Sequence, residues 1–211
     1  MTTAKTWLLT LAFTSMFAGE CARGADFALT AAEVARVNAR GVVVRATLDS
    51  GQRKGTVRAA VLIQAAPTIV FRQMTSCEDA IRYVPHLRAC RVRDQGPERS
   101  WLLVEHEVDF GWYAPRIGYV FRANLTTDRR IDFHQVSGDF KAYEGMWEFE
   151  PSADGASTLL RYRAYIDPPG FVPNWLARSA FKRDMPQMLT ELRRRCEAQQ
   201  RAAVPASTAG R

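Results

Sequence analysis

The segment Glu105-His106-Glu107-Val108-Asp109 combines residue types that could support acid–base or metal chemistry. A histidine beside carboxylates is a common composition for a proton relay or a metal site. The surrounding residues alternate in polarity, however, which predicts a β-strand, and side chains alternate between the two faces of a strand. The three carboxylates are therefore expected on one face and His106 on the other. We predict neither a catalytic triad nor a metal site here.

The other groups that could do chemistry give no stronger signal. His86 follows a proline between a predicted helix and a predicted strand, and His134 is predicted to face outward. The sequence contains no Gly-x-Ser-x-Gly, His-Glu-x-x-His or glycine-rich phosphate loop. We therefore predict no catalytic residue, no metal ligand and no cofactor, and the sequence favours a binding protein over an enzyme.

The N-terminus has the composition of a secretory signal peptide over residues 1–25, with Lys5 followed by a short apolar run and then small residues. The run is shorter than the roughly 20 residues that span a bilayer. Cys21 is either removed or inert, or it carries a lipid anchor, although Glu20 stands where a lipoprotein signal has a small residue. A periplasmic or secreted protein is expected.

Three cysteines remain after the signal peptide, in a chain that would meet an oxidising compartment. Cys77 and Cys90 are close in sequence, whereas Cys196 falls in the last predicted helix. We predict a Cys77–Cys90 disulfide.

The chain of 211 residues carries a net charge of +7, which could suit a nucleic acid or an anionic membrane. The strongest basic run, 193–195, lies on a predicted helix, where consecutive side chains point in different directions and cations suit the C-terminal end. We expect no nucleic-acid partner. Four aromatic residues flanked by arginines have two interpretations, a rim that touches a membrane transiently or packing of a loop against a helix; they are Trp112, Tyr113, Phe171 and Trp175.

Hydrophobic periodicity and turn residues predict the elements. Short helices are expected at 30–38, at 67–74 and from Ser76, and one long helix at 172–199 with a kink at Pro186. The expected strands are 42–48, 57–64, 87–94, 100–110, 116–127, 130–137, 142–150 and 157–166. The order predicts an α+β fold in which a curved antiparallel sheet wraps around the long C-terminal helix.

Several segments resemble the START-like polyketide cyclase superfamily (SRPBCC), nearest its coenzyme Q-binding START-domain branch. They are "VRAAVLIQAAPTIVF" (57–71), "YVPHLRACRV" (83–92), "GDFKAYEGMWEFEP" (138–151) and "DPPGF" (167–171). The resemblance implies a helix-grip fold whose sheet and helix enclose an apolar cavity for a lipid, quinone or polyketide-like ligand. The expected organisation is a signal peptide (1–25), an N-terminal extension (26–55), a START-like domain (56–200) and a disordered tail (201–211).

Alternation within each strand and the apolar stripes of the last helix assign the side chains that face this cavity. His106 would hydrogen-bond a ligand carbonyl from inside, or would be satisfied by a neighbouring tyrosine. Each aromatic could equally be ordinary core. The predicted cavity residues are Val104, His106, Val108, Tyr119, Phe121, Phe133, Trp147, Phe149, Tyr162 and Ala164 from strands and Trp175, Leu176, Ser179, Met185 and Leu189 from the helix.

We therefore predict an exported binding or transfer protein for a hydrophobic small molecule, a lipid or an isoprenoid quinone. The alternative from the enzyme class is a cyclase or aromatase, in which His106 or a tyrosine supplies a proton. A third alternative is an interaction module with a filled core. The sequence predicts no oligomeric state.

Overall fold

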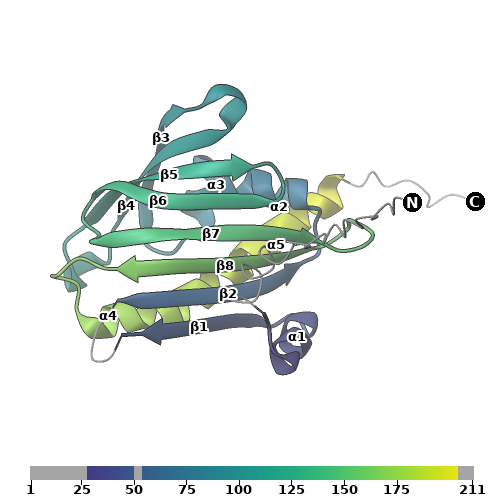
Figure 1. Cartoon of the computed structure of the whole chain (residues 1–211), viewed down its shortest axis with the longest axis horizontal. Coiled ribbons are helices and arrows are strands. Elements are labelled where there is room, and N and C mark those ends of the chain that lie inside the picture. The colour runs from purple at the N-terminus through teal and green to yellow at the C-terminus, as the bar shows by residue number, and fades with distance from the viewer. Residues whose placement is uncertain (1–27, 50–53, 204–211) are drawn as a thin grey trace, which may run out of the picture.

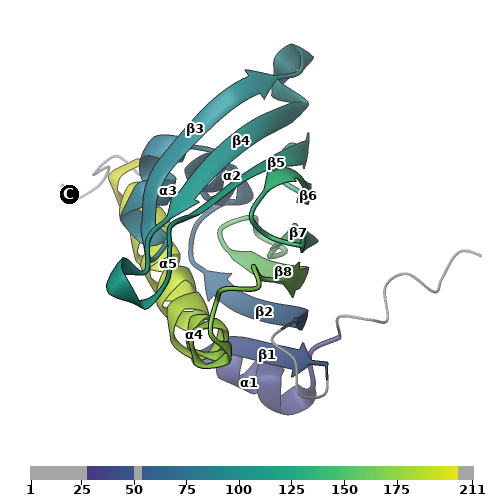
Figure 2. The same ribbon diagram turned by 90° about the vertical axis from the view of Figure 1, so that its left-hand side faces the viewer.

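A computed structural model describes residues 28–49 and 54–203. The described chain contains an eight-stranded antiparallel sheet in the order β1-β2-β8-β7-β6-β5-β4-β3 (Figure 1). The sheet curves around the C-terminal helix, which crosses its concave side (Figure 2). This is the predicted helix-grip architecture. The strands are β1 Val42–Leu48, β2 Gly55–Ile63, β3 Leu87–Gln95, β4 Trp101–Val108, β5 Ile117–Thr126, β6 Arg130–Gly138, β7 Ala142–Pro151 and β8 Thr158–Asp167.

Short helices occupy the connections, and one interrupted helix ends the described chain. Thr30 caps the first helix through the predicted capping box with Glu33. Two 3₁₀ turns, Pro97–Arg99 and Gly111–Tyr113, lie at opposite ends of β4. The α-helices are α1 Ala31–Asn38, α2 Pro67–Met74, α3 Cys77–Tyr83, α4 Asn174–Ser179 and α5 Met185–Ala203.

Between α4 and α5 the helix continues as a π-helical segment, Ala180–Asp184. Met185 donates its backbone N–H to the carbonyl oxygen of Ala180, five residues earlier. Pro186 follows directly and has no N–H to donate. The wider turn rotates the second half of the helix, so that Leu176 and Leu189, which are out of phase for one continuous α-helix, are both buried. Leu176 packs in a small cluster with Ile117 and Val172, and Leu189 packs in the main core. The phase change that predicted a kink at Pro186 thus takes the form of a π segment before the proline.

The first described strand belongs to the same sheet as the rest. β1 pairs with β2 along its whole length, from Val42↔Val61 to Leu48↔Gly55. The described part of the predicted N-terminal extension therefore continues the domain. At the other end of the chain, residues 201–203 belong to α5, whereas the predicted tail began at 201. The predicted signal peptide and residues 204–211 lie outside the described residues.

Glu197 of α5 ties the last helix to the start of the sheet. Its carboxylate accepts hydrogen bonds from Arg40, at 2.7 Å, and from the backbone N–H of Gln64, at 3.0 Å. Burial acts to raise the pKa of Glu197, but these two hydrogen bonds and the charges of Arg40 and Arg193 together outweigh it and lower the pKa. The ionised carboxylate therefore holds α5 to the residues just before β1 and just after β2.

Two positions of the "GDFKAYEGMWEFEP" segment require glycine because a side chain there would be strained or would collide with a neighbouring strand. Gly138 has φ 117°, a conformation that disfavours any side chain. Gly145 of β7 lies against β8, where an added Cβ would be 2.2 Å from the carbonyl oxygen of Arg163. Gly138 thus ends β6 close against β5, and Gly145 lets β7 lie close against β8.

The edge strand β3 is irregular. Its register with β4 shifts between Leu87 and Ala89 and again between Val92 and Asp94. Such bulges bend a strand and increase its twist, and the β3–β4 hairpin curls away from the rest of the sheet (Figure 2). No helix of residues 28–49 or 54–203 has the length and apolar character that a membrane crossing requires.

Candidate ligand-binding cavity

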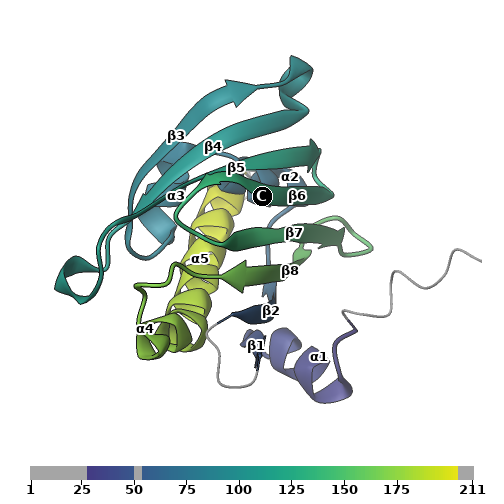
Figure 3. The ribbon, with the colours of Figure 1, turned by 60° about the vertical axis from the view of Figure 1, so that its left-hand side comes forward.

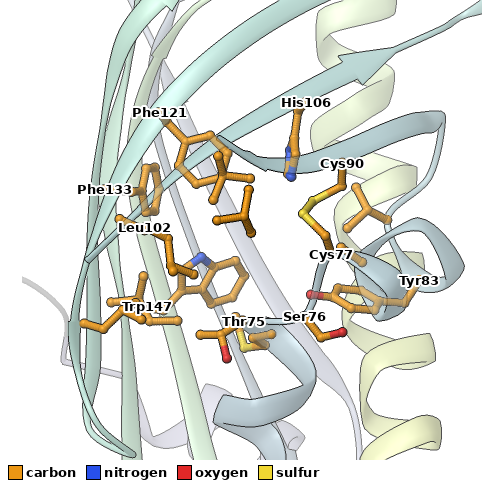
Figure 4. A pocket seen from close by; sticks show the side chains of 18 of the residues that line it. Thr75, Ser76, Cys77, Tyr83, Cys90, Leu102, His106, Phe121, Phe133 and Trp147 are labelled. Atoms are coloured by element: carbon orange, nitrogen blue, oxygen red, sulfur yellow. A yellow bond between two sulfur atoms is a disulfide. The ribbon is translucent and has the colours of Figure 1, made fainter. Parts of the chain in front are cut away.

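Two cavities lie between the concave side of the sheet and the helices. The α3 cavity, of about 150 Å³, is enclosed by α3, strands β3 to β7 and α5 (Figure 4). The α4 cavity, of about 200 Å³, lies between β5, β8, α4 and the π segment. Four residues line both cavities and form a partition between them: Val84, Tyr119, Tyr143 and Met188.

The predicted cavity residues divide into three groups. Those that line the α3 cavity are Val104, His106, Tyr119, Phe121, Phe133 and Trp147, and those that line the α4 cavity are Tyr119, Tyr162, Leu176 and Met185. Phe149, Ala164 and Leu189 are buried in the core and line neither. Val108 and Ser179 are half-buried and also line neither, and Trp175 is 55% exposed on the surface.

Other lining residues were missed from the sequence. The junction between α2 and α3, residues 74–76, forms one end of the α3 cavity, and Tyr83 lies beside it (Figure 4). These positions precede the strands and have no period-two signal. Tyr143, in contrast, has the same parity in its strand as Trp147, so extending the alternation by two steps would have found it.

His106 extends from β4 into the α3 cavity (Figure 4). Its Nδ1 is 3.0 Å from the hydroxyl oxygen of Tyr119 on the neighbouring strand, and its ring lies edge-on to Phe121. The structure thus has the arrangement in which a tyrosine satisfies this histidine. Burial lowers the pKa of His106 to about 4, so that the imidazole is neutral near pH 7. A neutral ring can donate to or accept from a ligand but adds no charge to the cavity.

Three tyrosines continue the polar line from His106. Tyr119 and Tyr143 are in ring contact, with centroids 5.4 Å apart, and Tyr143 shares a hydrogen bond with Tyr162. Burial raises the pKa of Tyr143 to about 12 and raises the pKa values of Tyr119 and Tyr162 as well. All three hydroxyls therefore stay protonated near neutral pH. Together with His106, these tyrosines give the wall neutral hydrogen-bonding groups on a mostly apolar background, and Asp184 adds a carboxylate to the α4 cavity.

The acidic residues next to His106 in sequence lie on the opposite face of β4. Glu105 pairs with Arg93 at 2.6 Å and with Arg91 at 3.3 Å, and Glu107 pairs with Arg116 at 2.9 Å. These hydrogen bonds from arginine lower the pKa of Glu105. The carboxylates thus form ion pairs on the outer surface, as alternation predicts, and none of them contacts the imidazole.

A disulfide joins Cys77, at the start of α3, to Cys90 on β3 (Figure 4). The two Cα atoms are 5.1 Å apart, and both residues line the α3 cavity. The bond is the one that the sequence predicts, and it fixes the helical wall of the cavity to the sheet. Cys196 is a free, buried cysteine.

An exposed aromatic patch lies beside the α4 cavity and consists of Trp112, Tyr113, Phe171 and Trp175. Trp112 is 87% exposed, and its ring lies 4.1 Å from that of Tyr113. Tyr113 in turn makes an edge contact with Trp175 at 5.3 Å. The connection between β4 and β5, which carries the first two residues, extends beyond the sheet on the side of α4 (Figure 3). Loop and helix therefore pack together and still leave their aromatic rings in solvent.

Comparisons with known proteins agree with this architecture. The sequence profile described as polyketide cyclase/dehydrase and lipid transport matches residues 63–193. A search of curated proteins gives no match.

Solved structures with the same fold include the STAR-related lipid transfer protein of Xanthomonas axonopodis, with a TM-score of 0.63 and 16% identity, covering 74% of this chain and 93% of that one. The Zhui aromatase/cyclase of Streptomyces sp. R1128 has a TM-score of 0.60 and 16% identity, over 72% and 98%. A START superfamily protein of Mycobacterium smegmatis has a TM-score of 0.52 and 16% identity, over 70% and 97%. At such identities the likeness establishes the fold alone. Because the profile spans more than half of the sequence, the chain belongs to the family described as polyketide cyclase/dehydrase and lipid transport.

Proposed function

We propose that the protein is an exported binding or transfer protein for an apolar ligand, a lipid or an isoprenoid quinone, held between the sheet and the last helix. The observation that carries this proposal is the pair of adjoining cavities with mostly apolar walls and a few polar groups, which include the carboxylate of Asp184 in the α4 cavity. Ligand sites commonly have this composition. Burial of ligand surface would drive binding at about 25 cal/mol per Å².

Each cavity is too small to hold a whole lipid by itself. A dry cavity of about 150 Å³ accommodates a benzene-sized molecule, and ligand sites commonly measure about 300–1,000 Å³. A lipid therefore needs both cavities. Met188 lies in the partition, and its unbranched thioether side chain can change rotamer at little cost. We expect Met188 to move aside, so that one chain runs from the α3 cavity into the α4 cavity.

The aromatic patch supports transient membrane contact during transfer. Aromatic rings favour the membrane–water interface, and this patch adjoins the α4 cavity through Leu176, the neighbour of Trp175. Arg178 is exposed and has no carboxylate partner among the described residues, which suits an anionic headgroup region. The patch would then be the face through which the ligand enters or leaves.

The experiment is mass spectrometry of an organic extract of the purified protein. We expect a lipid or quinone near one equivalent, and we expect Met188→Trp, which enlarges the partition, to reduce it. Thr190→Trp is a matched control, because Thr190 is on the same helix and exposed. An extract without apolar ligand, together with failure to take up added lipid, would reject the proposal.

A further inference from the structure

An open groove lies on the outer side of the junction between α2 and α3. Its walls include Arg72 from α2, Arg99 from the β3–β4 hairpin tip and Asp128 from the β5–β6 turn. Four residues that line this arginine groove also line the α3 cavity: Thr75, Ser76, Cys77 and Val92. These shared residues place the apolar cavity directly beside a cationic groove.

The two arginines are available for an anion. Arg72 is exposed, and neither Arg72 nor Arg99 forms an ion pair within residues 28–49 and 54–203. Arg99 donates one hydrogen bond, of 3.3 Å, to the carbonyl oxygen of Thr75, which holds its side chain across the end of the α3 cavity. The remaining donors of both guanidinium groups are suited to a carboxylate or a phosphate.

The backbone at the tip of the β3–β4 hairpin adopts an unfavourable conformation that places Arg99 over the α2–α3 junction. Glu98 and Arg99 have φ values of 51° and 57°, in the left-handed region that residues other than glycine disfavour. Two such residues in succession fix the direction in which the hairpin tip turns, and this direction brings Arg99 over the α2–α3 junction.

We propose that the arginine groove binds the anionic head of a single-chain amphiphile whose chain runs from the α3 cavity into the α4 cavity. This inference deepens the proposed function and rests on it. The narrow cavity admits one chain, because a volume of about 150 Å³ leaves no room for a second beside it. The chemistry recognised is a carboxylate or a phosphate next to an apolar chain. Asp128 offsets part of the positive charge, so the groove favours a head of low negative charge.

The test uses three amphiphiles with the same chain and different heads: laurate, dodecyl phosphate and dodecanol. Binding to the purified protein is measured by titration calorimetry at pH 8, with laurate and dodecyl phosphate below their critical micelle concentrations and dodecanol below its aqueous solubility. We expect laurate or dodecyl phosphate to bind about tenfold more tightly than dodecanol, because charge-assisted hydrogen bonds add to chain burial. The preferred anionic head identifies the source, a fatty acid or a phospholipid fragment.

The variant Arg72→Gln/Arg99→Gln removes both cations. It should lose the preference for the anionic heads and keep the affinity for dodecanol. The control Arg36→Gln/Arg201→Gln removes the same charge at exposed positions outside the groove and should bind all three probes like the wild type. A double variant that still prefers laurate or dodecyl phosphate to dodecanol overturns the inference.

A second variant is expected to bind laurate more tightly than the wild type. Because misfolding lowers affinity, it could not produce this gain. Asp128 has φ 59°, which asparagine tolerates well, so Asp128→Asn removes the negative charge without changing the turn. It should bind laurate a few-fold more tightly, with dodecanol unchanged. If the wild type binds dodecanol and both anions equally, the inference of an anionic head is rejected and the proposed function is kept. If the wild type binds none of the three probes, the proposed function is rejected as well.

Discussion

Nδ1 of His106 and the hydroxyl oxygen of Tyr119 lie 3.0 Å apart on neighbouring strands, inside the wall of the α3 cavity. The pair is electrically neutral, because burial lowers the pKa of His106 to about 4 and raises that of Tyr119.

This burial predicts a pH dependence of stability. The unfolded chain has a histidine pKa of about 6.5, so between about pH 6.5 and 4 it binds a proton that folded His106 does not. The free energy of unfolding should therefore fall as the pH decreases through this window, by at most about 1.4 kcal/mol per pH unit. Urea titrations at pH 5.0 and 7.0 would measure the difference. His106→Asn, which cannot be protonated, should show a smaller one, and an unchanged difference would contradict the low pKa.

Filling the cavity should separate ligand binding from stability. Ala123 lines the α3 cavity, whereas Ala164 is buried against Gly145 and lines neither cavity. Ala123→Phe should reduce the amount of bound lipid with a small change in melting temperature. Ala164→Phe should overpack the core and lose about 1–3 kcal/mol. Calorimetry and lipid extraction on the same samples test both, and equal destabilisation by the two substitutions would indicate that the α3 cavity cannot accept a ring.

The disulfide between Cys77 and Cys90 should stabilise the fold. Closing this short loop is worth about 3 kcal/mol in the chain-entropy model. Cys77→Ser/Cys90→Ser should unfold at a lower denaturant concentration and become insensitive to reducing agent, whereas the wild type should lose stability on reduction. Alkylation followed by intact-mass analysis provides the chemical check. Labelling of both cysteines without reduction would show that the bond does not form.

Gly145 should tolerate no side chain. A Cβ at this position would meet the Arg163 carbonyl oxygen and, at 2.7 Å, the Cα of Ala164. Gly145→Ala should therefore push β7 away from β8 and cost about 1–3 kcal/mol. Gly118→Ala is the control, because the nearest atom to its Cβ would be 3.9 Å away, and its stability should stay within about 0.5 kcal/mol of the wild type. Equal effects of the two substitutions would show that β7 and β8 can adjust to the extra methyl group.

The strands were predictable because each has one apolar face and ends at recognisable turn residues. Alternation places Trp147 and Phe149 on the same, inward face of β7. It does not say which inward side chain borders a cavity. Trp147 does, whereas Phe149 lies deeper and packs edge-on against Phe71 of α2. That distinction depends on how closely α2 approaches the sheet, a long-range contact that no local pattern records.

The last helix shows a different limit. The sequence indicates two apolar stripes out of phase, and Trp175 was assigned to the inner one. In the structure Leu176, before the π segment, and Phe181, within it, are both buried, whereas Trp175 is exposed on the surface. A proline signals an interruption, but the kind of interruption is set by tertiary packing.

The irregular outer strand β3 bears on how this protein avoids aggregation. An open sheet of eight strands has two edges with unpaired backbone groups, onto which another chain can add a strand. At one edge, β3 carries two bulges and the charged side chains of Arg91 and Arg93, and at the other, β1 packs against α1. The β3 edge therefore offers no flat, regular template. The domain can keep an apolar interior beneath an open sheet while this edge resists the addition of another strand when the cavity is empty.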